Sequence, residues 1–153
     1  MNKSPEHLLQ SRCMTWFRYQ YPHFSQLMFA VPNGGLRSKA EAGKMRAEGV
    51  KAGVADIILD IPNAQYHQFD IEMKAGAQQS DVQKRFQEYA EAAGHKYIIC
   101  RSYDQFKEEV ECYLSSVSPI MVEAIKEVYK RTKDEEIEKA RQKYQKLCNT
   151  RNH

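Results

Sequence analysis

The residues with the clearest chemical potential are an acid, Asp56, and an acid–x–lysine triplet, Glu72-Met73-Lys74. Residues two apart on a strand point to the same face, so Glu72 and Lys74 project together. If the segment around Asp56 pairs with them in register, two carboxylates lie close together and repel each other unless a cation neutralises them. Such oxygen ligands suit magnesium or manganese. This kind of ion can lower the pKa of bound water and polarise a phosphoryl oxygen, while a neighbouring lysine can orient the water or offset developing charge.

The same triplet also has a purely structural interpretation. Acid–x–lysine is a common pattern, and Glu72 with Lys74 could form a solvated charge pair that contributes less than ~1 kcal/mol to stability. Only the surrounding sequence distinguishes the two interpretations.

The hydrophobic pattern predicts that the acids lie on two neighbouring strands. Residues 54–60 form a short apolar run with an acid near its start, and residues 66–74 alternate with a period of two. The alternation places Asp70, Glu72 and Lys74 on one face and the apolar residues on the other. A Pro-Asn turn between the two segments predicts an antiparallel hairpin.

The other elements complete an α/β pattern. Ser4-Pro5 and Pro22 bound a first helix, and Ser80 caps a later helix that ends at Gly94. The expected order is helix, strand, helix, strand, strand, helix, strand, helix, which predicts a mixed β-sheet flanked by helices. The remaining elements are a strand at 27–31, a helix at 38–48, a strand at 97–100 and a helix at 103–115. In the helix after Ser80, the positions expected to face inward are Val82, Phe86, Tyr89, Ala90 and Ala93.

The last part of the chain differs in character. Residues 119–150 are rich in charge and predict one or two helices without strands. We therefore expect one domain over residues 1–116 and a charged helical C-terminal extension over residues 117–153. The extension could pack on the domain, pair with a second copy or fray.

Length and composition limit the class of protein. The chain has 153 residues, of which 42% are hydrophobic and 28% charged, as expected of one soluble domain. No apolar run approaches the roughly 18–20 residues that cross a bilayer, and the N-terminus lacks the apolar core of a secretory signal, so we expect a cytoplasmic protein without a membrane partner. The cysteines form no CxxC pair and are expected to be reduced, buried thiols: Cys13, Cys100, Cys112 and Cys148.

The net charge of +3 is unevenly distributed. Residues 1–55 hold eight Lys/Arg and three acids, whereas residues 56–116 hold six Lys/Arg and eleven acids. This asymmetry fits a protein that attracts a polyanion with one surface and gathers carboxylates at another. A chance distribution of solvated charge is the alternative.

Several motifs in a fixed order resemble one nuclease family. They are Pro32-Asn33-Gly34-Gly35, the segment from Glu48 to Asp56, Ile71-Glu72-Met73-Lys74, Ser80 with Gln83, and Gly94. Together they resemble the VRR-NUC (virus-type replication-repair nuclease) family of the PD-(D/E)xK superfamily, over roughly residues 4–106. The resemblance implies a restriction-endonuclease-like mixed sheet flanked by helices, and hydrolysis of DNA phosphodiesters that depends on Mg²⁺ or Mn²⁺.

The resemblance also assigns roles to individual residues. Asp56 resembles the first acidic motif, and Glu72 with Lys74 resembles the acid–x–lysine motif. Gln83 resembles the glutamine of the following helix, and Glu6 resembles a first-helix glutamate that completes a metal site with Asp56 and Glu72. One departure is Ala55, where the family usually has a proline that binds no metal.

Some of these residues have alternative explanations. Glu6 could simply favour the positive end of its helix dipole. Gln83 could return a hydrogen bond to the Ser80 cap in a capping box, and we expect that one side chain cannot serve fully both the cap and the site. Asp70 has no matching role and is interpreted as a strand-edge charge, and His23 and His67 as structural or surface residues.

A glycine loop followed by cations predicts contacts with the DNA backbone. Exposed N–H groups and basic side chains accept phosphate oxygens without reading bases. A plain loop beside a solvated helix face is the alternative. The residues concerned are Asn33, Gly34, Gly35, Arg37, Lys39, Lys44, Arg46 and Lys51.

The resemblance therefore implies an endonuclease acting on branched DNA such as Holliday junctions. Small members of this kind resemble phage proteins of replication, recombination or repair, and act as symmetric homodimers in the bacterial or phage-infected cell. The alternative is a non-catalytic DNA-binding module, or an adaptor that works through the helical extension.

Overall fold

The computed structural model of the chain describes residues 5–32 and 39–150 and contains a four-stranded mixed sheet in the order β1-β2-β3-β4. The predicted fold class is confirmed. The strands are β1 (Met28–Ala30), β2 (Ile57–Leu59), β3 (Phe69–Met73) and β4 (Lys96–Cys100). The helices are α1 (Pro5–Gln20), the short 3₁₀ helix η1 (Pro22–Phe24), α2 (Lys39–Ala47), α3 (Asp81–Ala92), α4 (Tyr103–Ser115) and α5 (Pro119–Thr150).

The register of the sheet is that of the predicted hairpin with a parallel strand added. β2 pairs antiparallel with β3, with Ile57 opposite Ile71, and β4 lies parallel to β3 on the other side. β2 is shorter than the predicted strand, so Asp56 lies one residue before it. Extending the antiparallel register by one residue brings Asp56 beside Glu72.

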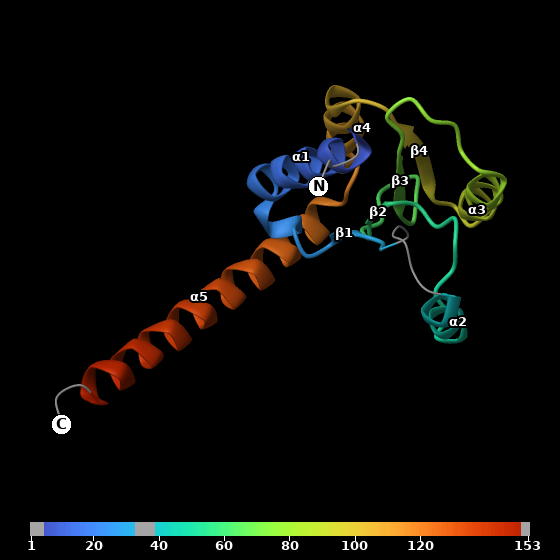
Figure 1. The fold of residues 1–153 in the computed structure, drawn as a ribbon. Coiled ribbons are helices and arrows are strands. Elements are labelled where there is room, and N and C mark those ends of the chain that lie inside the picture. Colours follow the sequence, from blue (N-terminus) through green and yellow to red (C-terminus); the bar gives the residue numbers. More distant parts are fainter. Residues whose placement is uncertain (1–4, 33–38, 151–153) are drawn as a thin grey trace. The chain divides into compact units, whose positions relative to one another are not determined.

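One face of the sheet packs against α1 and α4, and the other against α3 (Figure 1). The alternation of β3 divides its side chains between these two layers. The Phe69 ring stacks on Tyr113 of α4 with 4.9 Å between ring centroids. The apolar layer on this side includes Cys13, Phe17, Ile71, Cys100, Phe106 and Val110, all buried.

Fewer apolar side chains of α3 face the sheet than the sequence predicts. Ala90 is buried against Ala55 and Tyr97, with Phe86 packed beside them. Tyr89 is 73% exposed and Val82 50% exposed, and Ala93 is also exposed, so the predicted inward face is wrong for these positions. Instead, α3 turns the stripe of Gln83, Phe86, Gln87 and Ala90 inward, because the polar end of the sheet face requires hydrogen-bond donors from the helix.

Gly53 holds the segment before Asp56 close to α3. Its φ of +84° is in the left-handed region, and a Cβ atom there would come within 2.8 Å of the Val82 backbone. Only glycine combines this conformation with such a close approach. The entry to β2 is therefore set by contact with the first turn of α3.

Asp70 is not the strand-edge charge that the sequence suggested. It is fully buried in β3, which is paired on both edges and covered on both faces. Gln68 Nε2 donates to Asp70 Oδ1 at 2.7 Å, and His95 Nδ1 lies 2.9 Å from Oδ2. These partners satisfy a carboxylate that would otherwise be costly to bury.

The cysteines follow the prediction in part. Cys13 and Cys100 are buried free thiols, and burial raises the pKa of Cys13 to about 12. Cys112 is free but exposed, because it lies on the outer side of α4. Cys148 lies among the residues whose side chains are outside the described part.

The chain divides into two compact units, the first ending at Val117 and the second beginning at Ser118. In its described residues, the second unit consists of the long helix α5, whose exposed charges pair at i, i+3 spacing, as in Lys126 with Glu123 at 2.7 Å. Within the described residues, no helix has both the length and the apolarity needed to cross a membrane.

Candidate active site

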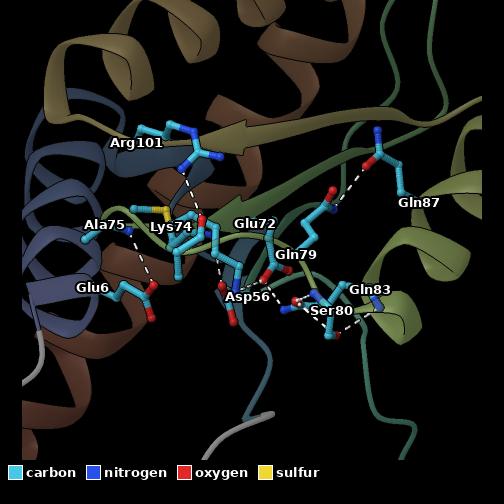
Figure 2. Close-up of polar contacts among 12 residues, drawn as sticks. Glu6, Asp56, Glu72, Lys74, Ala75, Gln79, Ser80, Gln83, Gln87 and Arg101 are labelled. Carbon is cyan, nitrogen blue, oxygen red and sulfur yellow. Dashed lines mark hydrogen bonds and ion pairs between the residues drawn. The ribbon is translucent and has the colours of Figure 1, made fainter.

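Asp56 and the acid–x–lysine triplet lie together at one end of the sheet. Asp56 precedes β2, and Glu72 and Lys74 are at the end of β3 (Figure 2). The Met73 N–H donates to Asp56 Oδ2 at 2.9 Å. This bond joins the two segments across the hairpin and turns the Asp56 carboxylate toward the triplet.

Glu72 is fully buried, and both of its oxygens have partners. Lys74 Nζ lies 3.0 Å from Oε1, and the Gln83 amide Nε2 donates to the same oxygen. The Tyr97 hydroxyl donates to Oε2 at 3.3 Å. The Lys74 side chain is only 12% exposed, so the interpretation of Glu72 and Lys74 as a solvated surface pair is wrong.

Both acids of the pair have a raised pKa, and burial is the largest cause for each. Burial, and then the nearby Asp56 charge, raise the pKa of Glu72 to about 7, although Lys74 opposes the shift. Burial also raises the pKa of Asp56, with a further contribution from Glu6, while the Met73 N–H and Lys74 oppose it. A positive ion beside these carboxylates would relieve both effects.

Gln83 serves the helix cap and the site at the same time. Its Oε1 accepts from the Ser80 N–H at 2.9 Å, which completes a capping box, and its Nε2 donates to Glu72. The expectation that one side chain cannot serve both is wrong, because the two ends of an amide have opposite hydrogen-bonding character.

Glu6 lies beside the site on the first turn of α1. Its Oε1 accepts from the Ala75 N–H at 3.3 Å, and its charge is close enough to raise the pKa of Asp56. Nevertheless, across residues 5–32 and 39–150 no group of three or more His, Cys, Asp or Glu side chains is arranged to hold a metal. Asp56 and Glu72 form a pair of carboxylates, with Glu6 outside it.

A pair of carboxylates is compatible with magnesium. Mg²⁺ is typically held by one or two carboxylates and completes its shell with water and substrate phosphate. Burial raises the pKa of Asp56 and of Glu72, and a bound cation would favour the charged form of both carboxylates. The donor set therefore fits a hard divalent cation.

A solved structure titled "VRR_NUC domain protein" matches this arrangement of elements. The match has a TM-score of 0.65 and covers 77% of this chain and 94% of that chain, with 24% sequence identity. The chain has a VRR_NUC-like fold. No protein-family model matches the sequence, and no curated protein matches it either.

Within the VRR_NUC-like fold, several residues that support the site were not predicted from the sequence. Burial raises the pKa of the Tyr97 phenol, which keeps its hydroxyl proton available for Glu72, and Gln79 interacts with the same hydroxyl. Gln79 Nε2 donates to Gln87 Oε1 at 3.0 Å, and Arg101 Nη1 donates to the carbonyl of Ala77 at 3.1 Å (Figure 2). The spacing of Gln79, Gln83 and Gln87 by four residues is the sequence pattern that could have indicated Gln79 and Gln87.

The basic segment is described only in part. Asn33, Gly34, Gly35 and Arg37 lie outside the described residues, and Lys39 begins α2 with its side chain undescribed. Lys44, Arg46 and Lys51 are exposed, and Lys44 lies 3.9 Å from Glu48. Contact between this segment and DNA stays a prediction.

Proposed function

We propose that the protein is a metal-dependent DNA endonuclease that hydrolyses phosphodiester bonds. The observation that carries the proposal is the convergence of Asp56 with buried Glu72 and Lys74 at one end of a VRR_NUC-like sheet. Three charged groups from two separate segments, two of them with a raised pKa, are typical of a catalytic site rather than of a structural ion pair.

Asp56 and Glu72 would hold Mg²⁺ or Mn²⁺, with Glu6 available as an additional ligand through a change of its hydrogen bond to Ala75. When bound, the ion supplies a water of lowered pKa and polarises the phosphoryl oxygen.

The protein groups position and neutralise charge. Gln83 and Tyr97 fix the orientation of the Glu72 carboxylate. The Lys74 ammonium, held at Glu72, would orient the water that attacks phosphorus and offset negative charge as the bond to the 3′-oxygen breaks. Phosphoryl transfer asks little more of a protein than such positioning and charge stabilisation.

We further propose branched DNA, such as a Holliday junction, as the substrate and a symmetric homodimer as the active form. A two-fold dimer presents two equivalent sites to the two strands that must be cut. The basic residues between Asn33 and Lys51 would hold the phosphate backbone without reading sequence. Such an activity belongs to phage replication, recombination or repair.

A non-catalytic DNA-binding module is the second candidate. The observation that favours it is the lack, in the described part of the chain, of a third carboxylate arranged with Asp56 and Glu72.

A cleavage assay separates the two candidates. A labelled four-way junction and a linear duplex of the same sequence are incubated with the protein in EDTA, Mg²⁺ or Mn²⁺. We expect products only with a divalent ion, and Lys74→Ala should lower the rate by about a hundredfold or more while junction binding persists. Lys96→Ala is the matched control, because Lys96 is also largely buried and paired with a glutamate, Glu109, at 2.6 Å.

Binding without product in both metals would favour the non-catalytic module. Cleavage by Lys74→Ala at the wild-type rate would show that the proposed mechanism is wrong.

A further inference from the structure

A second candidate ligand site lies on the outer side of α1, apart from the carboxylates. An open groove of about 430 Å³ is formed by one face of α1 and the first residue of α4. We call it the α1 groove, and its lining residues are Ser11, Arg12, Thr15, Trp16, Tyr19 and Tyr103.

Half of the residues that line the α1 groove are aromatic. Trp16 contacts Tyr103 edge to face, with 6.5 Å between ring centroids. Tyr19 lies one helical turn beyond Trp16 on α1 and is 85% exposed. An accessible ring of this kind can accept a flat partner by stacking.

Two cations lie over the Tyr103 ring at the end of the α1 groove: Arg12, which lines the groove, and Lys107, which lies beside it. Arg12 Cζ lies 4.0 Å and Lys107 Nζ 5.3 Å from the centroid of Tyr103. Neither cation forms an ion pair with any acid in the described part of the chain. An anion bound beside this ring would be attracted by this positive charge.

Aromatic rings beside unpaired cations are the components that bind unpaired nucleotides. Bases stack on the rings and phosphates contact the cations, with little dependence on sequence. A duplex does not offer its base faces in this way, so the same surface discriminates against it.

We propose that the α1 groove binds single-stranded DNA, with a base on Tyr19 and backbone phosphate at Arg12 and Lys107. The proposal deepens the proposed function, because it assigns an unpaired strand to the branched substrate of the nuclease. Binding is nevertheless independent of cleavage, so the two can fail separately.

The single tryptophan of the chain, Trp16, lies in the α1 groove and reports its occupancy. The full-length protein in EDTA is titrated with a twelve-nucleotide oligo(dT), with a blunt duplex of the same length, and with inorganic triphosphate. Trp16 emission and the anisotropy of labelled DNA are followed together. We expect oligo(dT) to change Trp16 emission and the duplex to leave it unchanged.

Two variants test the roles of ring and charge. Tyr19→Ala should weaken oligo(dT) binding about tenfold. Arg12→Ala should also weaken binding, and it should reduce the slope of log affinity against log salt concentration by about 0.7, as expected for one lost phosphate contact. The matched controls are Tyr89→Ala and Arg85→Ala, an exposed ring and an exposed cation on α3, which should bind as wild type. Melting temperatures verify that each variant is folded.

Several outcomes would overturn the proposal. One is oligo(dT) binding that leaves Trp16 emission unchanged, and another is equal loss of affinity in the α3 controls. Emission that changes with protein concentration alone, and no longer does so in Tyr19→Ala, would show that a second copy occupies the groove. Oligo(dT) binding in a protein that cuts no DNA would support the groove and reject the nuclease.

Discussion

At the scale of single residues, the candidate site depends on how one buried carboxylate is stabilised. Glu72 receives Lys74 and Gln83 at one oxygen and Tyr97 at the other. A buried charge without such partners would cost several kcal/mol. The same contacts hold the carboxylate in one orientation, which a ligand to a small divalent ion requires.

Tyr97 supplies the first residue-scale prediction. Tyr97→Phe removes the hydroxyl that holds Glu72 Oε2, so Mn²⁺ affinity measured by calorimetry should fall about tenfold, as is typical when an outer-shell partner is lost. Tyr113→Phe is the control, because Tyr113 is also buried and its hydroxyl donates to the Ile61 carbonyl on the opposite side of the sheet. Equal losses in both variants would contradict a specific role for Tyr97.

The raised pKa of Glu72 predicts a pH dependence of stability. Because the folded-state pKa is about 7 and the ordinary value is 4.5, the folded protein binds more protons than the unfolded chain between these limits. The contribution of Glu72 is therefore fully favourable below about pH 4.5 and is lost as pH rises through 7. In urea unfolding without metal, wild type should lose up to ~3 kcal/mol relative to Glu72→Gln between pH 5 and pH 8. Parallel pH profiles for the two proteins would refute this assignment.

At the scale of elements, α3 does more than cover the sheet. Its first turn carries the capping box, and Gln83 and Gln87 on its inner side bond to Glu72 and Gln79. The amphipathic pattern alone assigned the inner side to larger apolar residues, including Val82 and Tyr89. α3 is rotated relative to that predicted inner face because the buried Glu72 carboxylate requires a hydrogen-bond donor from the helix that covers it.

Two substitutions separate the cap from the site. Ser80→Ala removes the cap and should cost about 1 kcal/mol in unfolding free energy, with metal affinity kept. Gln83→Glu retains a capping acceptor but replaces the donor to Glu72 with a second acid, so metal-free stability should fall as pH rises above neutrality. Urea unfolding and Mn²⁺ calorimetry measure both effects. If the stability of Gln83→Glu depends on pH as that of the wild type does, the contact between Gln83 and Glu72 contributes little to stability.

At the scale of the whole molecule, the chain consists of a mixed α/β unit and a long charged helix. All the site contacts are made within the first unit, which ends at Val117. The exposed side chains of α5 are mostly charged, with Val128 and Ile137 among its exposed apolar residues.

Truncation tests the independence of the two units. A chain that ends at Ser118 should unfold cooperatively and retain metal-dependent cleavage, because it keeps the complete sheet and its helices. If α5 joins two copies, light scattering should show a loss of dimers in the truncated chain. Aggregation or non-cooperative unfolding of the truncated chain would show that the first unit requires α5.

The amino-acid sequence by itself determined the order of elements, the hairpin, and the placement of Glu72 and Lys74 on the same face of a strand. These features follow from local periodicity, which records which side chains share a face. Only the tertiary structure decided that Asp70 and Glu72 are buried, that Gln83 serves both cap and carboxylate, and that Tyr97 completes the site. Burial of a polar side chain depends on which distant element covers its face and which donors that element brings, and this information is not contained in the spacing of neighbouring residues.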